Sequence, residues 1–235
     1  MKTIGLIGGM SWESTQFYYQ QINEAVRQRL GGLHSAKLLL NSVDFAPIEK
    51  LQHAGDWGAT AEILSQAAQS LEAGGADFFL ICTNTMHVMA DDVQAGVNIP
   101  LLHIADATAR AVKEQGLKSV GLLGTRFTME KEFYRGRLEK AHKLKVFVPD
   151  QTGREFVHNV IYDELVQGVI KDPSRQGYKE VIQELVKEGA EGIVLGCTEI
   201  GLLVKKEDVS VPIFDTMEIH ALAAVDAALG RYELS

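Results

Sequence analysis

Short apolar runs alternate along the chain with longer segments of helical periodicity. Apolar runs that predict buried strands cover residues 3–7, 38–43, 78–81 and 99–102. Residues 13–30, 59–73 and 105–115 predict helices, a further short helix is expected to end near Gly96, and residues 44–57 predict a loop. The helix over 59–73 places its apolar residues on one face and is expected to stop at Gly74-Gly75. Strands that alternate with helices in this way form parallel sheets covered on both faces, so the pattern predicts an α/β fold.

The same order of segments occurs twice. Residues 2–8 (KTIGLIG) resemble residues 118–124 (KSVGLLG), which lie 116 positions later. Residues 75–87 (GADFFLICTNTMH) resemble residues 189–201 (GAEGIVLGCTEIG) at 114 positions, and 97–102 (VNIPLL) resemble 209–214 (VSVPIF) at 112. Three matches in chain order favour an internal duplication over the general likeness of α/β segments. We therefore expect two similar α/β domains, 1–104 and 105–211, packed with a cleft between them.

Composition and charge narrow the class of protein. The chain has 235 residues, of which 46% are hydrophobic and 23% are charged, as in an ordinary globular protein with a sizeable core. Its net charge of −8 argues against nucleic acid or an anionic membrane as the main partner. Trp12 and Glu13 follow the first apolar run too soon for a signal peptide, and no run is long enough to span a membrane. The two cysteines predict free thiols in a reducing, cytoplasmic setting.

A cysteine and two polar residues follow the buried strand that we predict near residues 193–195. Cys197 precedes Thr198 and Glu199, at the end of a strand where open α/β sheets place their ligands. On its own Cys197 would most often be a small buried side chain. The repeat places Thr83 opposite Cys197 and Cys82 opposite Gly196. Two groups that approach one carbon from opposite faces suit racemisation or epimerisation by general acid–base catalysis.

The glycine-rich turn after the first strand does not favour a nucleotide site. Its spacing, Gly5-x-x-Gly8-Gly9, differs from the dinucleotide-binding fingerprint. The simpler interpretation is a tight turn whose exposed amides can bind a carboxylate.

These motifs resemble the aspartate/glutamate racemase family. The resemblance rests on residues 2–10, on Asn84-Thr85-Met86-His87 and on Gly196-Cys197-Thr198-Glu199, and it covers essentially the whole chain. It implies an enzyme that works without pyridoxal phosphate or another cofactor, with two cysteines in the cleft between two similar domains, and a homodimer. It also implies that the C-terminal segment, 212–235, joins the first domain. We identify no metal-ligand spacing, and His34, His53, His103, His142, His158 and His220 are interpreted as structural.

The chain departs from the family pattern at the first catalytic position. Family members have a cysteine directly before the asparagine, whereas Thr83 stands there in this chain and Cys82 lies one residue earlier, as in a subgroup of the family. Because adjacent strand residues point to opposite faces, we expect Cys82 in the core and Thr83 in the cleft. The alternative is a bulged turn in which Cys82 still serves.

The basic residues that bind the distal carboxylate in the family's aspartate racemases are also hard to place. Residues 44–52 contain no arginine, and residues 165–168 contain no lysine. Neutral or broader substrates are therefore plausible beside aspartate and glutamate.

The predicted function is a cofactor-independent amino-acid racemase with Thr83 and Cys197 as catalytic residues. The alternatives are a broad-specificity racemase of neutral amino acids and a non-catalytic amino-acid sensor on the same frame. Glu199 and His87 are candidates to poise the thiol, and Arg126 is a possible substrate anchor. Candidate substrate-binding residues are Met10, Gln52, Asn84, Thr85, Thr125, Thr128 and Thr198, with Ser11 beside them in the first loop.

Overall fold

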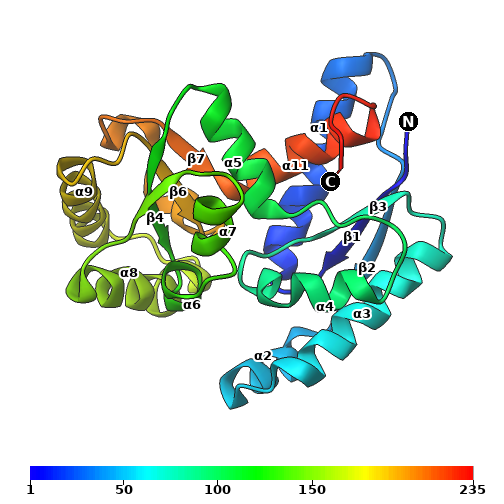
Figure 1. Ribbon diagram of the computed structural model, residues 1–235, viewed down its shortest axis with the longest axis horizontal. Coiled ribbons are helices and arrows are strands. Elements are labelled where there is room, and N and C mark those ends of the chain that lie inside the picture. The colour runs from blue at the N-terminus through cyan, green and yellow to red at the C-terminus, as the bar shows by residue number, and fades with distance from the viewer. Residues whose placement is uncertain (235) are drawn as a thin grey trace. The chain divides into compact units, whose positions relative to one another are not determined.

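A computed structural model describes residues 1–234. The chain divides into two compact units. Of the described residues, unit 1 comprises 1–104 and 220–234, and unit 2 comprises 105–219. Figure 1 shows the elements of each unit. No helix of the described residues is long and apolar enough to cross a membrane.

Each unit contains a parallel sheet and the helices that connect its strands. In the first part of the chain these elements are β1 (Ile4–Gly8), α1 (Trp12–Leu30), β2 (Leu38–Ser42), α2 (Phe45–Ala54), α3 (Trp57–Ala73), β3 (Phe78–Ile81), the 3-10 helix η1 (Thr85–Met89) and α4 (Ala90–Ala95). They are followed by α5 (Ile104–Glu114), β4 (Ser119–Gly124), α6 (Arg126–Glu130), α7 (Arg135–Lys140), β5 (Lys145–Phe147), α8 (Gln151–Asp163), η2 (Leu165–Gln167) and α9 (Asp172–Lys187). The last elements are β6 (Ile193–Gly196), α10 (Ile200–Leu203), η3 (Lys206–Asp208), β7 (Ile213–Asp215) and α11 (Thr216–Ala228). The predicted α/β class is confirmed.

The two sheets have the same strand order. Unit 1 has the order β2-β1-β3, and unit 2 has β5-β4-β6-β7, with every pair parallel. Strands β1, β3, β4 and β6 are buried along their whole length, as their continuous apolar runs predict. In unit 1 a single bridge between Phe79 and Leu101 takes the place of the fourth strand. The predicted strand at 99–102 is thus reduced to one paired residue.

The pairing registers reproduce the sequence repeat. Ile7 pairs with Ile81 in unit 1, and Leu123, 116 positions after Ile7, pairs with Leu195, 114 positions after Ile81. The amide of Phe79 donates to the carbonyl of Pro100 over 3.0 Å, and the equivalent amide of Ile193 donates to that of Pro212 over 2.8 Å. The residues that follow β3 and β6 therefore occupy equivalent places in their units.

The segment predicted as a loop at 44–57 contains a helix, α2, and the prediction is wrong there. Asp44 caps its start by accepting a hydrogen bond from the Ala46 amide, and Gly55 ends it in a left-handed conformation with φ 73°. Pro47 lies in the first turn, where backbone N–H groups have no partner within the helix, so it does not break the helix. Asp, Pro and Gly in one short stretch indicate a loop by composition, but here each stands where a helix end accepts it.

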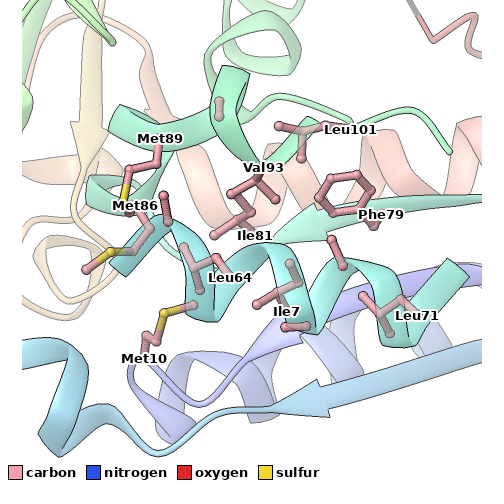
Figure 2. Packing of buried hydrophobic residues seen from close by; sticks show 14 of the residues in the cluster. Ile7, Met10, Leu64, Leu71, Phe79, Ile81, Met86, Met89, Val93 and Leu101 are labelled. Carbon is pink, nitrogen blue, oxygen red and sulfur yellow. The ribbon is translucent and has the colours of Figure 1, made fainter. Parts of the chain in front are cut away.

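The apolar core of unit 1 lies between its sheet and the helices α3 and α4. Figure 2 shows Leu71 and Phe79 at one end of this cluster and Met10, Met86 and Met89 at the other. The methionines follow the carboxyl ends of β1 and β3, so flexible thioether side chains close the core beneath the turn that carries Thr83.

The C-terminal segment differs from the expected domain boundary. The resemblance predicts residues 212–219 in the first domain, but β7 pairs with β6 in the sheet of unit 2, and of this C-terminal segment only the part from His220 onward belongs to unit 1. Thr216 adds a further bond within unit 2, because its hydroxyl donates to the Leu195 carbonyl over 2.8 Å. Strand pairing therefore moves the boundary from 212 to the middle of α11.

Candidate active site

In unit 2, Cys197 lies directly beyond β6 and contacts a carboxylate. Its Sγ donates to Oε2 of Glu199 over 3.0 Å, and the hydroxyl of Thr198 donates to the same oxygen over 2.7 Å. All three side chains are partly exposed. The turn thus presents a thiol to solvent with a proton acceptor already in contact.

The surroundings of Cys197 disfavour the ionised form of its thiol. Burial is the largest cause that raises its pKa well above the usual value, and the charge of Glu199 and the hydrogen bond to it raise the pKa further. Protein atoms exclude much of the water that would solvate a thiolate, although part of the side chain remains accessible. Cys197 therefore becomes a base only when its proton moves to a neighbouring group.

Asp215 is a second carboxylate near Cys197 that the sequence did not single out. Its charge also raises the pKa of Cys197. The pKa of Asp215 is itself raised, mainly by burial, although the amides of Met217 and Glu218 donate to Oδ1. A Cβ on Gly201 would approach its other oxygen, Oδ2, to 2.7 Å, which requires glycine there unless Asp215 shifts. The only feature of the sequence that points to Asp215 is the position of an acidic residue at the end of the strand that we name β7.

In unit 1, Thr83 occupies the place of Cys197. Thr83 is two residues beyond Ile81, and Cys197 is two residues beyond Leu195, the equivalent paired position. Thr83 is partly exposed, whereas Cys82 is only 1% exposed and burial strongly raises its pKa. Cys82 thus lies in the core, and a thiol in that position is poorly suited to exchange protons with a substrate.

The other candidate residues of unit 1 surround the same turn or support it. Asn84 is buried and Thr85 is partly exposed at the start of η1. Met10 is part of the core cluster, and Gln52 is a buried residue of α2. The place of Gln52 in the site rests on the sequence.

The turn after β1 was expected to offer free amides to an anion, but one of these amides is hydrogen-bonded within the protein. The Gly9 amide, expected to be open to a carboxylate, donates to the Thr15 hydroxyl over 2.9 Å, and that hydroxyl donates to the Ser11 carbonyl over 2.8 Å. The expectation for this amide is wrong because the Thr15 side chain turns back over the loop.

The equivalent turn of unit 2 is closed in a similar way. The Thr125 hydroxyl caps α6 by accepting from the Thr128 amide, and the two hydroxyls lie 3.3 Å apart. Both side chains are buried, so their first role is to cap this short helix. Arg126 is exposed at its start. Within residues 1–234, no three His, Cys, Asp or Glu side chains form a group that could hold a metal ion.

Comparison with known proteins agrees with the architecture of the site. Residues 7–224 match the profile of the Asp/Glu/hydantoin racemase family. The broad-specificity amino-acid racemase RacX of Bacillus subtilis (strain 168) is 22% identical over 96% of this chain and 98% of its own length.

Solved structures give the same match. A Yersinia pestis protein, provisionally described as an Asp/Glu racemase, is 57% identical, with a TM-score of 0.95 over 97% of this chain and 100% of its own. An aspartate racemase homologue of Pyrococcus horikoshii OT3 is 37% identical, with a TM-score of 0.86 over the same shares of the two chains.

Proposed function

The chain belongs to the Asp/Glu/hydantoin racemase family and is a cofactor-independent amino-acid racemase, and from this premise we propose that Thr83 and Cys197 are the two groups that move the α-proton. Racemisation removes the proton from Cα on one face and returns a proton on the other, so it needs two groups. The observation that carries the proposal is the equivalence of Thr83 and Cys197 in the paired registers of the two sheets.

In the proposed mechanism, the Cys197 thiol passes its proton to the Glu199 carboxylate and the resulting thiolate takes the proton from Cα. The electron pair of the broken C–H bond stays on the substrate as a carbanion conjugated with its carboxylate. Thr83 donates its hydroxyl proton to the opposite face of that carbon and recovers a proton from water, and Glu199 gives the proton that it took to the hydroxide so formed, which restores the resting site. In the reverse direction the Cys197 thiol is the donor.

The asymmetry of the pair has a chemical consequence. A threonine hydroxyl does not titrate in the physiological range, so Thr83 supplies far less of its ionised form than Cys197 does and needs a neighbour or water to take its proton before it can act as a base. The hydroxyl and amide groups of Asn84, Thr85 and Thr198 are proposed to bind the substrate's α-carboxylate.

Acidic amino acids are the leading substrates. The support is the likeness to a Yersinia pestis protein and a Pyrococcus horikoshii homologue whose names refer to aspartate or glutamate. Neutral amino acids are the second candidate, because residues 44–52 contain no arginine and the full-length match to RacX is to a broad-specificity enzyme.

We also propose a cytoplasmic homodimer. Free Cys82 and Cys197 suit a reducing compartment, and α1 leaves the aromatic side chains of Trp12, Phe17 and Tyr19 exposed. Size-exclusion chromatography with light scattering tests the dimer, and a monomer at micromolar concentration contradicts it.

The test of the function is a screen of single L- and D-amino acids with the purified protein, followed by chiral chromatography. We expect conversion of aspartate or glutamate by the wild type, loss of conversion in Cys197→Ala, and conversion close to wild type in Cys82→Ala. Cys82→Ala is the matched control because it removes a thiol one residue before Thr83 that lies in the core. Activity that survives in Cys197→Ala but not in Cys82→Ala contradicts the proposal.

A further inference from the structure

His87 binds the backbone of the proposed catalytic turn. Its Nδ1 lies 2.8 Å from the carbonyl oxygen of Thr83, and its Nε2 lies 3.3 Å from the backbone nitrogen of Ile104. A carbonyl only accepts and an amide N–H only donates, so Nδ1 carries the proton and Nε2 is the acceptor. These two contacts therefore fix a neutral imidazole in one tautomer.

His87 is held from its other sides by two buried histidines. The ring of His103 lies 4.5 Å from that of His87 between centroids, and the ring of His220 lies 5.9 Å away. His220 is fixed in turn, because its Nε2 contacts the Leu102 carbonyl over 2.8 Å and its Nδ1 contacts the Tyr18 hydroxyl over 2.9 Å. All three histidines are less than 5% exposed. Such a fixed ring is a rigid support for the turn.

We propose that His87 is a positioning residue for Thr83, an inference that rests on the proposed catalytic role of Thr83. The Nδ1–H bond fixes the plane of the peptide group between Thr83 and Asn84. That plane sets the direction in which the Thr83 side chain leaves the backbone, and proton transfer depends steeply on such alignment. His87 acts through the backbone and does not contact the substrate.

Two substitutions separate the two contacts of the ring. The side-chain amide of asparagine ends where Nδ1 of histidine stands, so His87→Asn can still donate to the Thr83 carbonyl but leaves the Ile104 amide. The amide of glutamine reaches the position of Nε2, so His87→Gln can still accept from Ile104 but leaves Thr83. If His87 only packs, both substitutions should affect proton transfer by Thr83 to a similar extent. If His87 positions Thr83, only His87→Gln should weaken that proton transfer.

The readout is the partition of one substrate between exchange and racemisation in D2O. After Cys197 removes the α-proton and its thiol exchanges with D2O, a deuteron returned by Cys197 gives labelled starting enantiomer, and a deuteron from Thr83 gives the opposite enantiomer. The ratio of labelled substrate to product is measured for each enantiomer by chiral chromatography with mass detection. Because unfolded protein does neither reaction, this ratio does not depend on the folded fraction. Thr83→Ala is the reference, and we expect it to raise the ratio for the enantiomer that Cys197 deprotonates.

We expect His87→Gln to raise the same ratio about tenfold, as the loss of one aligning hydrogen bond of roughly 1.4 kcal/mol predicts. His87→Asn should stay within about twofold of the wild type. An unchanged ratio in His87→Gln, or an equal rise in both variants, overturns the inference alone. An unchanged ratio in Thr83→Ala overturns the proposed role of Thr83 and this inference with it.

A second measurement is independent of any variant. Proton–nitrogen correlation spectra of the wild type with labelled histidine should give a neutral, Nδ1-protonated ring for His87. An Nε2-protonated ring there overturns the inference.

Discussion

Two assays of one variant, Glu199→Gln, distinguish the two effects that Glu199 has on Cys197. The carboxylate repels a thiolate, yet it is also the acceptor through which we propose that the thiol loses its proton. The amide of glutamine is nearly the same size and carries no charge. The variant therefore removes repulsion and the proton acceptor together, and two assays should respond in opposite directions.

The repulsion is large enough to detect. At an effective dielectric constant of about 20, two unit charges roughly 3 Å apart repel by about 5 kcal/mol. Partial exposure of both side chains weakens this. Even a quarter of that energy equals about one pKa unit, because one unit corresponds to roughly 1.36 kcal/mol. The pKa of Cys197 should fall in the variant, although burial still holds it above the usual value. Alkylation of Cys197 by iodoacetamide at pH 8 should be at least about tenfold faster, measured by mass spectrometry in the Cys82→Ala background.

The same variant has no carboxylate to accept the thiol proton. It should therefore racemise its substrate only through the fraction of Cys197 that is already ionised. An unperturbed thiol with a pKa of ~8.5 is only about 0.3% thiolate at pH 6, and burial lowers that fraction. We expect kcat/KM of Glu199→Gln to rise about tenfold per pH unit between pH 6 and 8, whereas the wild type, which carries its own acceptor, changes little. Slower alkylation contradicts the repulsion of the thiolate by Glu199, and a pH profile equal to that of the wild type refutes the role of Glu199 as proton acceptor.

Two further predictions concern Thr83 and the hydrogen bonds of Asp106 in unit 2. Thr83→Cys should increase kcat in chiral chromatography assays, because a thiol titrates far closer to neutral pH than a hydroxyl, and an unchanged kcat while Cys82→Ala is inactive would indicate the bulged turn. Asp106 accepts two hydrogen bonds of 2.7 Å from Arg137 and one of 2.7 Å from His142. Burial raises its pKa, but these bonds outweigh burial and lower it, so its stabilising effect is present at neutral pH and is lost as the pH falls through the lowered pKa. Asp106→Asn should lower the free energy of unfolding by roughly 2 kcal/mol at pH 7 and by less at pH 3 in urea denaturation, and an equal loss at both pH values contradicts this.

The sequence was sufficient for the class of fold and for the equivalence of the two candidate positions, because strand pairing in a duplicated sheet preserves the spacing of residues. Thr83 could be aligned with Cys197 from the 114-residue repeat, and the registers of β3 and β6 agree with that alignment.

The sequence was not sufficient where tertiary contacts decide. Residues 44–57 predict a loop, although capping at both ends allows the helix α2 to form there. The closeness of Asp215 to Cys197 depends on β7 lying beside β6, which also moves the domain boundary past residue 212. The contact of His87 with the Thr83 carbonyl follows from the turn into η1, which hydrophobic periodicity does not describe.

The central claim is that two different groups move the α-proton, one on each face. The most direct test is racemisation of a single enantiomer of aspartate or glutamate in D2O, stopped at low conversion, with the deuterium content at Cα of the product read by mass spectrometry. A mechanism with two groups predicts that nearly every product molecule of the opposite enantiomer carries one deuterium at Cα after its first turnover. A product that retains its original proton, or the absence of any product, contradicts the account.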